Sequence, residues 1–310
     1  MTAADSWTLA DMPDQGGRTV LVTGTSVGGL GHHTALELAR RGARVVLAGR
    51  TERKLAETDE AIRGEVPHAE LEHLTVDLAS LSSVRRGAAE AARLGPLDVL
   101  VNNAGVMGTP YSRTEDGLEQ QMATNHFGPF LLTGLLLPQL VASGSATVVA
   151  VSSQFHRYAR SAPLGDPRAE GRYSRWPAYA QSKLANLLFT YELDRRARRA
   201  GLPVRALAAH PGFAGTHLAA NGQLGRSRGG IATILDAAVR AVSQSAAAGA
   251  LPTLMAATAD LPGGTYCGPG GPAEMSGAPR VVSSNRLSHD EDAQRRLWDL
   301  SEDVTGIRYP

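Results

Sequence analysis

A tyrosine and a lysine four residues apart are the side chains of this 310-residue chain best suited to proton transfer. Tyr179 and Lys183 stand in YAQSKLANLLFTYEL, a stretch that predicts a helix, and residues four apart on a helix share a face. A phenol titrates near pH 10. A cation about 4 Å away contributes roughly 4 kcal/mol at an effective dielectric constant of about 20, enough for Lys183 to lower the pKa of Tyr179 by about one to three units. The pair is a candidate general acid–base, although its spacing alone is common in helices.

A glycine-rich turn follows the first apolar run of the chain. RTVLVTG (18–24) predicts a buried strand, HHTALELARRG (32–42) predicts a helix, and TGTSVGGLG joins the two. Glycines in such a turn let the backbone approach a pyrophosphate, and the helix N-terminus presents unpaired N–H groups. The turn predicts a dinucleotide site, with a plain tight connection as the alternative.

The end of the second predicted strand (43–49) distinguishes between dinucleotides. An acidic residue there would bind the ribose 2′-hydroxyl, whereas an arginine would pair with a 2′-phosphate. The stretch LAGRTERK places Arg50 at this position, with Arg53 and Lys54 close behind, and a guanidinium can bind phosphate through two hydrogen bonds. NADP(H) is therefore favoured over NAD(H), and one of Arg53 and Lys54 is expected to be a solvated residue at a helix start.

Apolar runs alternate with helix-length segments along most of the chain. Further strands are predicted at 70–77, 97–105, 145–153 and 202–212, and further helices at 51–64 and 81–94. These strands show little polar alternation and are separated by helical stretches, which is typical of a parallel sheet covered on both faces. The pattern predicts a doubly wound α/β fold of the Rossmann type with about seven strands.

One domain is expected over residues 17–310, preceded by an N-terminal extension at 1–16. Residues 213–230 are rich in Gly, Ala and Arg and predict a substrate lid, with an ordinary surface loop as the alternative. Residues 260–310 are predicted to be an irregular C-terminal segment, closed by an amphipathic helix that ends near Gly306.

The composition argues against several classes of protein. Lys and Arg number 31 against 30 for Asp and Glu, so no overall field attracts nucleic acid or an anionic membrane. No apolar run approaches the ~20 residues of a membrane span, and the first residues lack the apolar segment of a secretory signal. The one cysteine, Cys267, cannot form an internal disulfide, and no grouping of ligands suggests a metal. We expect a cytoplasmic protein without nucleic acid, membrane span or metal.

Taken together, these stretches resemble the short-chain dehydrogenase/reductase family. The motifs NNAG, ATNHFGPFLLT, VVAVSSQFH, YAQSKLAN and HPGFAGT follow one another in the family's order, over about residues 17 to 260. The long interval between the serine and tyrosine motifs, RYSRWPAYAQSKLANLLFTYEL and RLWDLSEDVTG are similar to the retinol-dehydrogenase-like branch. The resemblance implies an NADP(H)-dependent oxidoreductase that transfers hydride between nicotinamide and a ketone or secondary alcohol of a small organic substrate.

The resemblance also implies roles for individual residues. The implied catalytic residues are Asn125, Ser153 (rather than Ser152), Tyr179 and Lys183. With Arg50, the implied cofactor contacts are Gly24, Thr25, Ser26, Gly29, Leu30, Gly31, Asp77, Leu78, Asn103, Ala104, Gly105, Tyr179, Lys183, Pro211, Gly212 and Thr216. Gly29 and Gly31 align with the last two glycines of the family's Thr-Gly-x-x-x-Gly-x-Gly turn, with one extra residue in the loop. Candidate substrate contacts are His156, Phe213, His217 and Leu218.

Two other functions stay open on the same fold. One is NADPH-dependent reduction of a carbon–carbon double bond or epimerisation, and the other is a non-catalytic dinucleotide-binding sensor. Relatives pair through the helices that carry Asn125 and Tyr179, so a homodimer or a homotetramer is an option.

Overall fold

The computed structural model describes residues 7–163, 165–171, 173–213 and 244–310. The predicted contacts Thr216, His217 and Leu218, and nearly all of the predicted lid, therefore lie outside the described residues.

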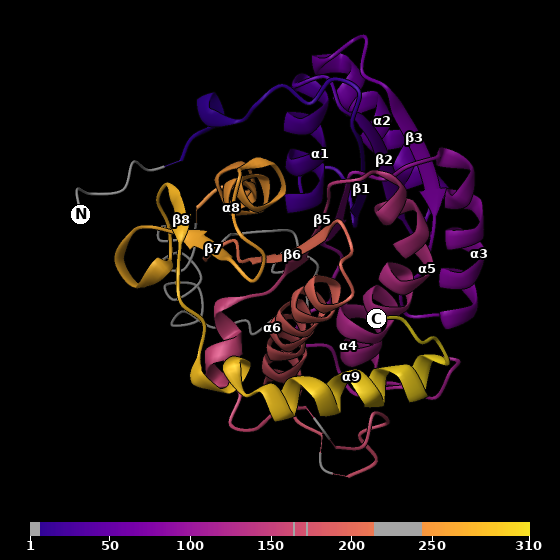
Figure 1. The fold of residues 1–310 in the computed structure, drawn as a ribbon, viewed down its shortest axis with the longest axis vertical. Coiled ribbons are helices and arrows are strands. Elements are labelled where there is room, and N and C mark those ends of the chain that lie inside the picture. Colours follow the sequence, from indigo (N-terminus) through magenta and orange to yellow (C-terminus); the bar gives the residue numbers. More distant parts are fainter. Residues whose placement is uncertain (1–6, 164, 172, 214–243) are drawn as a thin grey trace, which may run out of the picture.

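One eight-stranded sheet forms the centre of the fold (Figure 1), in the order β3-β2-β1-β4-β5-β6-β7-β8. Its strands are β1 (Thr19–Thr23), β2 (Arg44–Gly49), β3 (Leu71–Thr75), β4 (Val99–Asn102), β5 (Ala146–Val151), β6 (Val204–Ala209), β7 (Tyr266–Pro269) and β8 (Pro279–Val281). Strands β1 to β7 run parallel to one another, and β8 is antiparallel to β7. The predicted doubly wound α/β fold is confirmed, with eight strands rather than about seven.

The central strands are apolar on both sides because each side meets a helical layer. Within β1, Val20 and Val22 belong to one core cluster and Leu21 to the other, as the two-residue period of a strand requires. A strand buried on both faces has no solvent side. This explains why the sequence shows continuous apolar runs rather than alternation.

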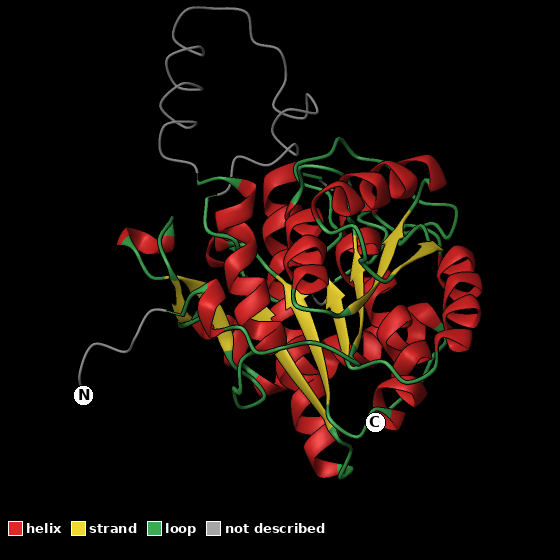
Figure 2. Cartoon of the chain, turned by 90° about the horizontal axis from the view of Figure 1, so that it is seen from above, coloured by secondary structure: helices red, strands yellow, loops and turns green. Residues whose placement is uncertain are grey.

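Helices cover both faces of the sheet (Figure 2). On one face lie α1 (Leu30–Arg40), α2 (Glu52–Glu65) and α8 (Ala246–Thr258), and on the other lie α3 (Leu81–Ala91), α5 (Gly128–Ala142) and α6 (Arg175–Arg199). The short α4 (Gln120–Met122) and a π-helical turn, η3 (Ala123–Phe127), lead into α5. Among the described residues, no helix is both long enough and apolar enough to cross a membrane.

The C-terminal segment is more regular than the sequence predicted. The closing helix is confirmed: α9 (Glu291–Thr305) ends at Gly306, which has a φ of 67°, and it lies across α6 (Figure 1). The interpretation of 260–280 as irregular was wrong for β7 and β8. These strands have only four and three residues and contain Gly or Pro, so neither carries a readable pattern.

The described part of the predicted N-terminal extension packs on the sheet's helices. Trp7 and Met12 join the same core cluster as α1 and α8, and the side chain of Gln15 is fully buried. Residues from Trp7 onward are therefore part of the packed structure.

Candidate active site

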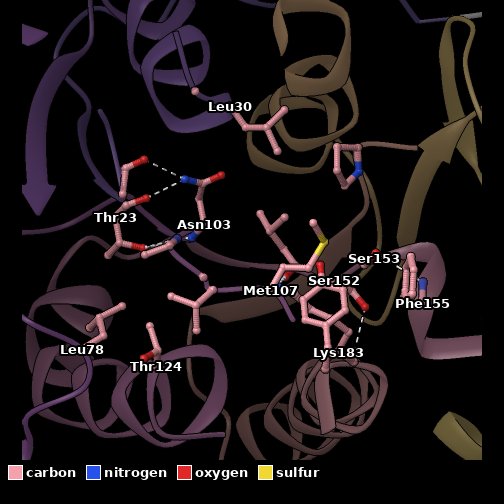
Figure 3. Close-up of a pocket in the computed structure, with 18 of the residues that line it drawn as sticks. Thr23, Leu30, Leu78, Asn103, Met107, Thr124, Ser152, Ser153, Phe155 and Lys183 are labelled. Carbon is pink, nitrogen blue, oxygen red and sulfur yellow. Dashed lines mark hydrogen bonds between the residues drawn. The ribbon is translucent and has the colours of Figure 1, made fainter. Parts of the chain in front are cut away.

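A cavity of about 2180 Å³ runs along the carboxyl ends of the parallel strands (Figure 3). Its lining comes from the segments that follow β1, β2, β3, β4, β5 and β6, together with α6 and the loop between β7 and β8. In doubly wound folds, ligands bind at this edge, where the strand order reverses. Single drug-sized ligands occupy roughly 300–1,000 Å³, so this cavity has room for a dinucleotide and a second molecule.

Most of the predicted cofactor contacts line this cavity. They are Gly24, Thr25, Ser26, Gly29, Leu30, Arg50, Leu78, Asn103, Ala104, Gly105, Tyr179, Lys183, Pro211 and Gly212. Gly31 lies behind the lining, and Thr216 is outside the described residues. Asp77 is absent from the lining, and its carboxylate accepts a hydrogen bond from the N–H of Ala79 (2.9 Å).

The extra residue of the glycine-rich turn is taken up by a β-turn. The N–H of Gly29 donates to the carbonyl of Ser26 (3.0 Å), and Gly28 takes the positive φ of 74° that suits the third position of such a turn. Helix α1 then begins at Leu30, with Gly29 as its N-cap. The lengthened loop therefore leaves the helix N-terminus at the cavity.

Gly31 allows a close approach of backbone segments that no larger residue would permit. A Cβ added there would lie 2.5 Å from both the side-chain nitrogen of Asn103 and the carbonyl oxygen of Gly24. That nitrogen donates to the carbonyls of Thr23 (2.7 Å) and Gly24 (3.2 Å), and the Thr23 hydroxyl accepts the N–H of Asn103 (3.0 Å). The ends of β1 and β4 are thus joined below the place where a pyrophosphate would lie.

Two exposed cations stand at the end of the cavity that follows β2. Arg50 and Lys54 line it, and neither side chain has a hydrogen-bond or ion-pair partner within the described ranges. Arg53 instead pairs with Glu57 along α2, so it is the solvated residue that the sequence analysis expected. A cradle of glycines and a helix N-terminus fit the pyrophosphate of a dinucleotide.

The structure brings Ser153, rather than Ser152, to the tyrosine. Ser153 is the serine that acts on the Tyr179 phenol, whose pKa it lowers, and its hydroxyl accepts the N–H of Phe155 (3.2 Å). Ser152 is turned to the backbone, and its hydroxyl donates to the carbonyl of Lys183 (2.8 Å; Figure 3). The assignment by position in the sequence motif is the one that the geometry favours.

Burial dominates the pKa values of the tyrosine and the lysine. It raises the pKa of Tyr179 to about 12, against the smaller lowering effect of the Ser153 side chain. It lowers the pKa of Lys183 to about 8. The Lys183 ammonium lies 5.8 Å from the centre of the phenol ring and donates to the carbonyl of Val151 (3.0 Å). The expected lowering of the phenol pKa is therefore not found in this structure, because removal from water raises that pKa.

Asn125 is held rigidly in the π-helical turn that precedes α5. Its amide nitrogen donates to the Val106 carbonyl (2.9 Å) and the Ser182 hydroxyl (2.9 Å), and its carbonyl accepts the N–H of Val106 (2.8 Å). A Cβ added to Gly105 would lie 3.1 Å from the side-chain oxygen of Asn125 and 3.3 Å from the Lys183 nitrogen. Isolated π-turns often occur at functional sites, and this one places Asn125 beside the lysine.

A cluster of aromatic rings reaches the tyrosine through Phe155. The ring of Phe155 lies 5.4 Å from Tyr179, 5.5 Å from Tyr158 and 5.6 Å from Trp176, measured between centroids. Of the candidate substrate contacts, Phe213 lines the cavity. Sequence reasoning missed Phe155, since a phenylalanine in a short turn has no distinguishing pattern.

His156 is a correction, because it is absent from the lining of the cavity. Its side chain is fully buried, and its ring contacts the carbonyl of Ser153 (2.7 Å) and the N–H of Asn285 (3.2 Å). Burial lowers its pKa to about 4. It fixes the turn after Ser153 from behind instead of contacting substrate.

A carboxylate in the β7–β8 loop also lines the cavity, and sequence reasoning missed it. Glu274 contacts Gln154 and Arg157 of the turn η4 (Gln154–Tyr158) as well as His210 at the end of β6. The available signal was that Glu274 is the sole acidic residue between Asp260 and Asp290.

Comparisons with known proteins agree with this geometry. A family model described as short chain dehydrogenase matches residues 18–226. The chain is 38% identical to human retinol dehydrogenase 13 over 298 residues and 40% identical to mouse polyprenol dehydrogenase over 307 residues, in each case covering 95% of this chain and 86% of the relative. Among solved structures, it is similar to an uncharacterized protein from Mycobacterium paratuberculosis (43% identity, TM-score 0.79, covering 98% of this chain and 99% of that one). It is also similar to a short chain dehydrogenase from Shigella flexneri complexed with NADP (25% identity, TM-score 0.61, covering 82% and 98%).

Proposed function

The chain belongs to the short chain dehydrogenase family, within its retinol-dehydrogenase-like branch, and we propose that it transfers hydride between NADP(H) and a ketone or secondary alcohol. Membership makes it an oxidoreductase that depends on a pyridine nucleotide, and the resemblance predicted from the motifs is confirmed. The observation that carries the proposal is the buried phenol of Tyr179, which shares the wall of a cavity large enough for a dinucleotide with Ser153 and Lys183.

The proton and the hydride are handled by different groups. The nicotinamide, when bound, supplies or accepts the hydride. The Tyr179 hydroxyl gives a proton to the substrate oxygen during reduction and removes it during oxidation. Ser153 donates a hydrogen bond to the same oxygen and stabilises the negative charge that develops there.

Lys183 and Asn125 support this proton transfer from behind. With a pKa of about 8, Lys183 is mostly charged at neutral pH, and its charge stabilises the phenolate left when Tyr179 has given up its proton. Asn125 ties the segment after β4 to α6 through Val106 and Ser182. It thereby holds the helix that carries the tyrosine and the lysine.

The cavity and the relatives together support the choice of cofactor and the class of substrate. Arg50 and Lys54 favour a cofactor with a 2′-phosphate. The names of the relatives, retinol dehydrogenase and polyprenol dehydrogenase, and the aromatic rings around Phe155 support an apolar alcohol or its carbonyl counterpart as substrate. A cytoplasmic location and pairing into a homodimer or homotetramer stay predictions from the sequence.

NADPH fluorescence titration combined with a panel of ketones, alcohols and enones tests the proposal. We expect micromolar binding of the order usual for such enzymes and turnover of ketones. Tyr179→Phe is expected to lower turnover by about a hundredfold or more while leaving the NADPH Kd within about threefold. Tyr111→Phe is the matched control, because Tyr111 is exposed and bonds only to the surface residues Arg168 and Arg113 among the described residues.

Three results would contradict the proposal. Near-normal turnover in Tyr179→Phe would remove the tyrosine from the reaction. Turnover of enones or stereoinversion without turnover of ketones would favour the double-bond reductase or epimerase. NADPH binding without turnover of any compound would favour the sensor.

A further inference from the structure

The carboxylate of Glu274 joins two walls of the cavity that lie far apart in the sequence. One oxygen accepts hydrogen bonds from the side-chain nitrogen of Gln154 (2.9 Å) and from Nε2 of His210 (3.1 Å). The other oxygen lies 3.1 Å from the guanidinium of Arg157. The loop between β7 and β8 thereby contacts both the turn after β5 and the end of β6.

On the first wall, Glu274 fixes the turn that Ser153 begins. Gln154 and Arg157 both belong to η4, whose N-cap is Ser153. Arg157 also donates to the side chain of Gln154 (2.9 Å) and to the carbonyl of Ser283 (2.6 Å). The position of the serine therefore depends on a network centred on this carboxylate.

On the second wall, Glu274 orients the segment that follows β6. Nδ1 of His210 accepts the N–H of Gly212 (3.1 Å), so this nitrogen carries no proton, and Nε2 must then be the donor to Glu274. Together the two contacts select the neutral imidazole with its proton on Nε2. His210 is fully buried, and burial lowers its pKa, which agrees with a neutral ring. The carboxylate thus holds the ring that holds the backbone of Gly212.

The loop that carries Glu274 is itself under conformational strain. Ala273 and Glu274 have φ values of 50° and 54°, in the left-handed region that residues with a side chain seldom occupy. The carbonyl of Met275 accepts the N–H of Phe213 (2.8 Å), and a Cβ on Gly212 would lie 2.5 Å from that carbonyl oxygen. Such strain persists where surrounding contacts over-determine the conformation, and it concentrates at functional sites.

We propose that Glu274 is a positioning residue, which sets the spacing between the Ser153 turn and the Pro211–Gly212 segment. This role rests on the proposed function, in which the substrate oxygen meets Ser153 and the cofactor would contact Pro211 and Gly212. Both segments line the cavity, and so does Glu274. A shift of about 1 Å between reacting groups can lower a rate by about a hundredfold. Because Glu274 fixes the spacing of these two segments, its loss is expected to slow hydride transfer.

Steady-state kinetics of Glu274→Gln with NADPH and a ketone that the wild type reduces test this role. The amide keeps the size of the carboxylate but presents an NH2 group to partners that are themselves donors. We expect kcat to fall about tenfold or more, with the NADPH Kd within about threefold. We also expect a larger deuterium isotope effect for NADPH labelled at the transferred hydrogen, because hydride transfer becomes slower. Glu65→Gln, which breaks the exposed pair with Arg40, is the matched control and should change none of these values.

A double-mutant cycle separates positioning from a general loss of structure. Gln154→Met removes one contact of the carboxylate. If the two residues act through one network, the double variant Gln154→Met/Glu274→Gln has about the same kcat as Glu274→Gln alone. Should Glu274→Gln fail to fold, Arg157→Met, at a half-exposed side chain, is expected to lower kcat with NADPH binding retained.

Several outcomes would overturn the role. They are wild-type kcat and isotope effect in folded Glu274→Gln, strictly multiplicative losses in the cycle, and, where Glu274→Gln does not fold, an unchanged kcat in Arg157→Met. In each case an active wild type leaves the proposed function standing. A wild type without any redox turnover would overturn the proposed function and this role together.

Discussion

The two ends of the cavity are built on opposite electrostatic principles. At the end that follows β2, Arg50 and Lys54 are exposed and their charges are solvated. At the end near α6, Tyr179 and Lys183 are only 6% and 5% exposed, and burial shifts both pKa values toward the neutral forms. The first end can attract a fixed negative charge from water. At the second end, burial raises the free energy of every charged group, so the transfer of a proton there changes the free energy strongly.

After the loss expected for Tyr179→Phe, the largest effect is predicted for the solvated end. Arg50→Ala should weaken NADPH binding by about 10- to 100-fold, because a hydrogen bond to a charged group contributes about 1.5–3 kcal/mol. NADH binding should change by less than about threefold. Paired fluorescence titrations measure both values. The matched control is Arg53→Ala, since Arg53 is already paired with Glu57. Equal losses for the two cofactors would mean that Arg50 does not meet a 2′-phosphate.

The variant Gly31→Ala tests the close packing of the glycine-rich turn, which lies between the two ends of the cavity. The added methyl would press on Asn103 and on the carbonyl of Gly24 at 2.5 Å. Overpacking of this kind destabilises by about 1–3 kcal/mol, measurable by urea denaturation, and NADPH binding should weaken with it. Gly64→Ala, inside α2 with nothing within 4 Å of the new atom, should be neutral or stabilising by up to about 1 kcal/mol. Equal stabilities of the two variants would contradict the close approach at Gly31.

A pH dependence is expected at the buried end. The pKa of Lys183 is about 8, so the ammonium is present below this pH and is lost as the pH rises through it. Ketone reduction at saturating NADPH should therefore be nearly constant below about pH 8 and fall by at most about tenfold per pH unit above it. Lys183→Met, which keeps much of the side-chain volume, should be slower and lack this break. A break at the same pH in that variant would assign it to another group.

The fold was predictable because its signals are local. Val20 to Val22, the glycine turn and Arg50 each lie within a few residues of the element they define, and the motifs around Asn125, Ser153 and Tyr179 gave the order of the site. The extra residue in the glycine turn was located from its spacing alone, although only the structure shows the β-turn that accommodates it.

What the sequence could not give depends on packing between distant segments. The pKa of Tyr179 was expected to fall because Lys183 shares its helix face, yet burial by other elements raises it. His156 was assigned to substrate because it follows Ser153, but Asn285 holds its ring on the other side of the turn. Glu274 drew no attention because its partners are more than sixty residues away along the chain.

Helix α9 occupies a surface of α6 that another copy of the chain could otherwise contact. Trp298, 2% exposed, stacks on Phe189 of α6, and the Tyr309 hydroxyl donates to the carbonyl of Phe130 in α5. Ser301 of α9 meets His126, next to Asn125, at 2.7 Å. A second copy that approached this side of α6 would meet α9 in place of α6. Displacement of α9 would expose Trp298 to water and would remove the contact of Ser301 with His126 in the turn that carries Asn125.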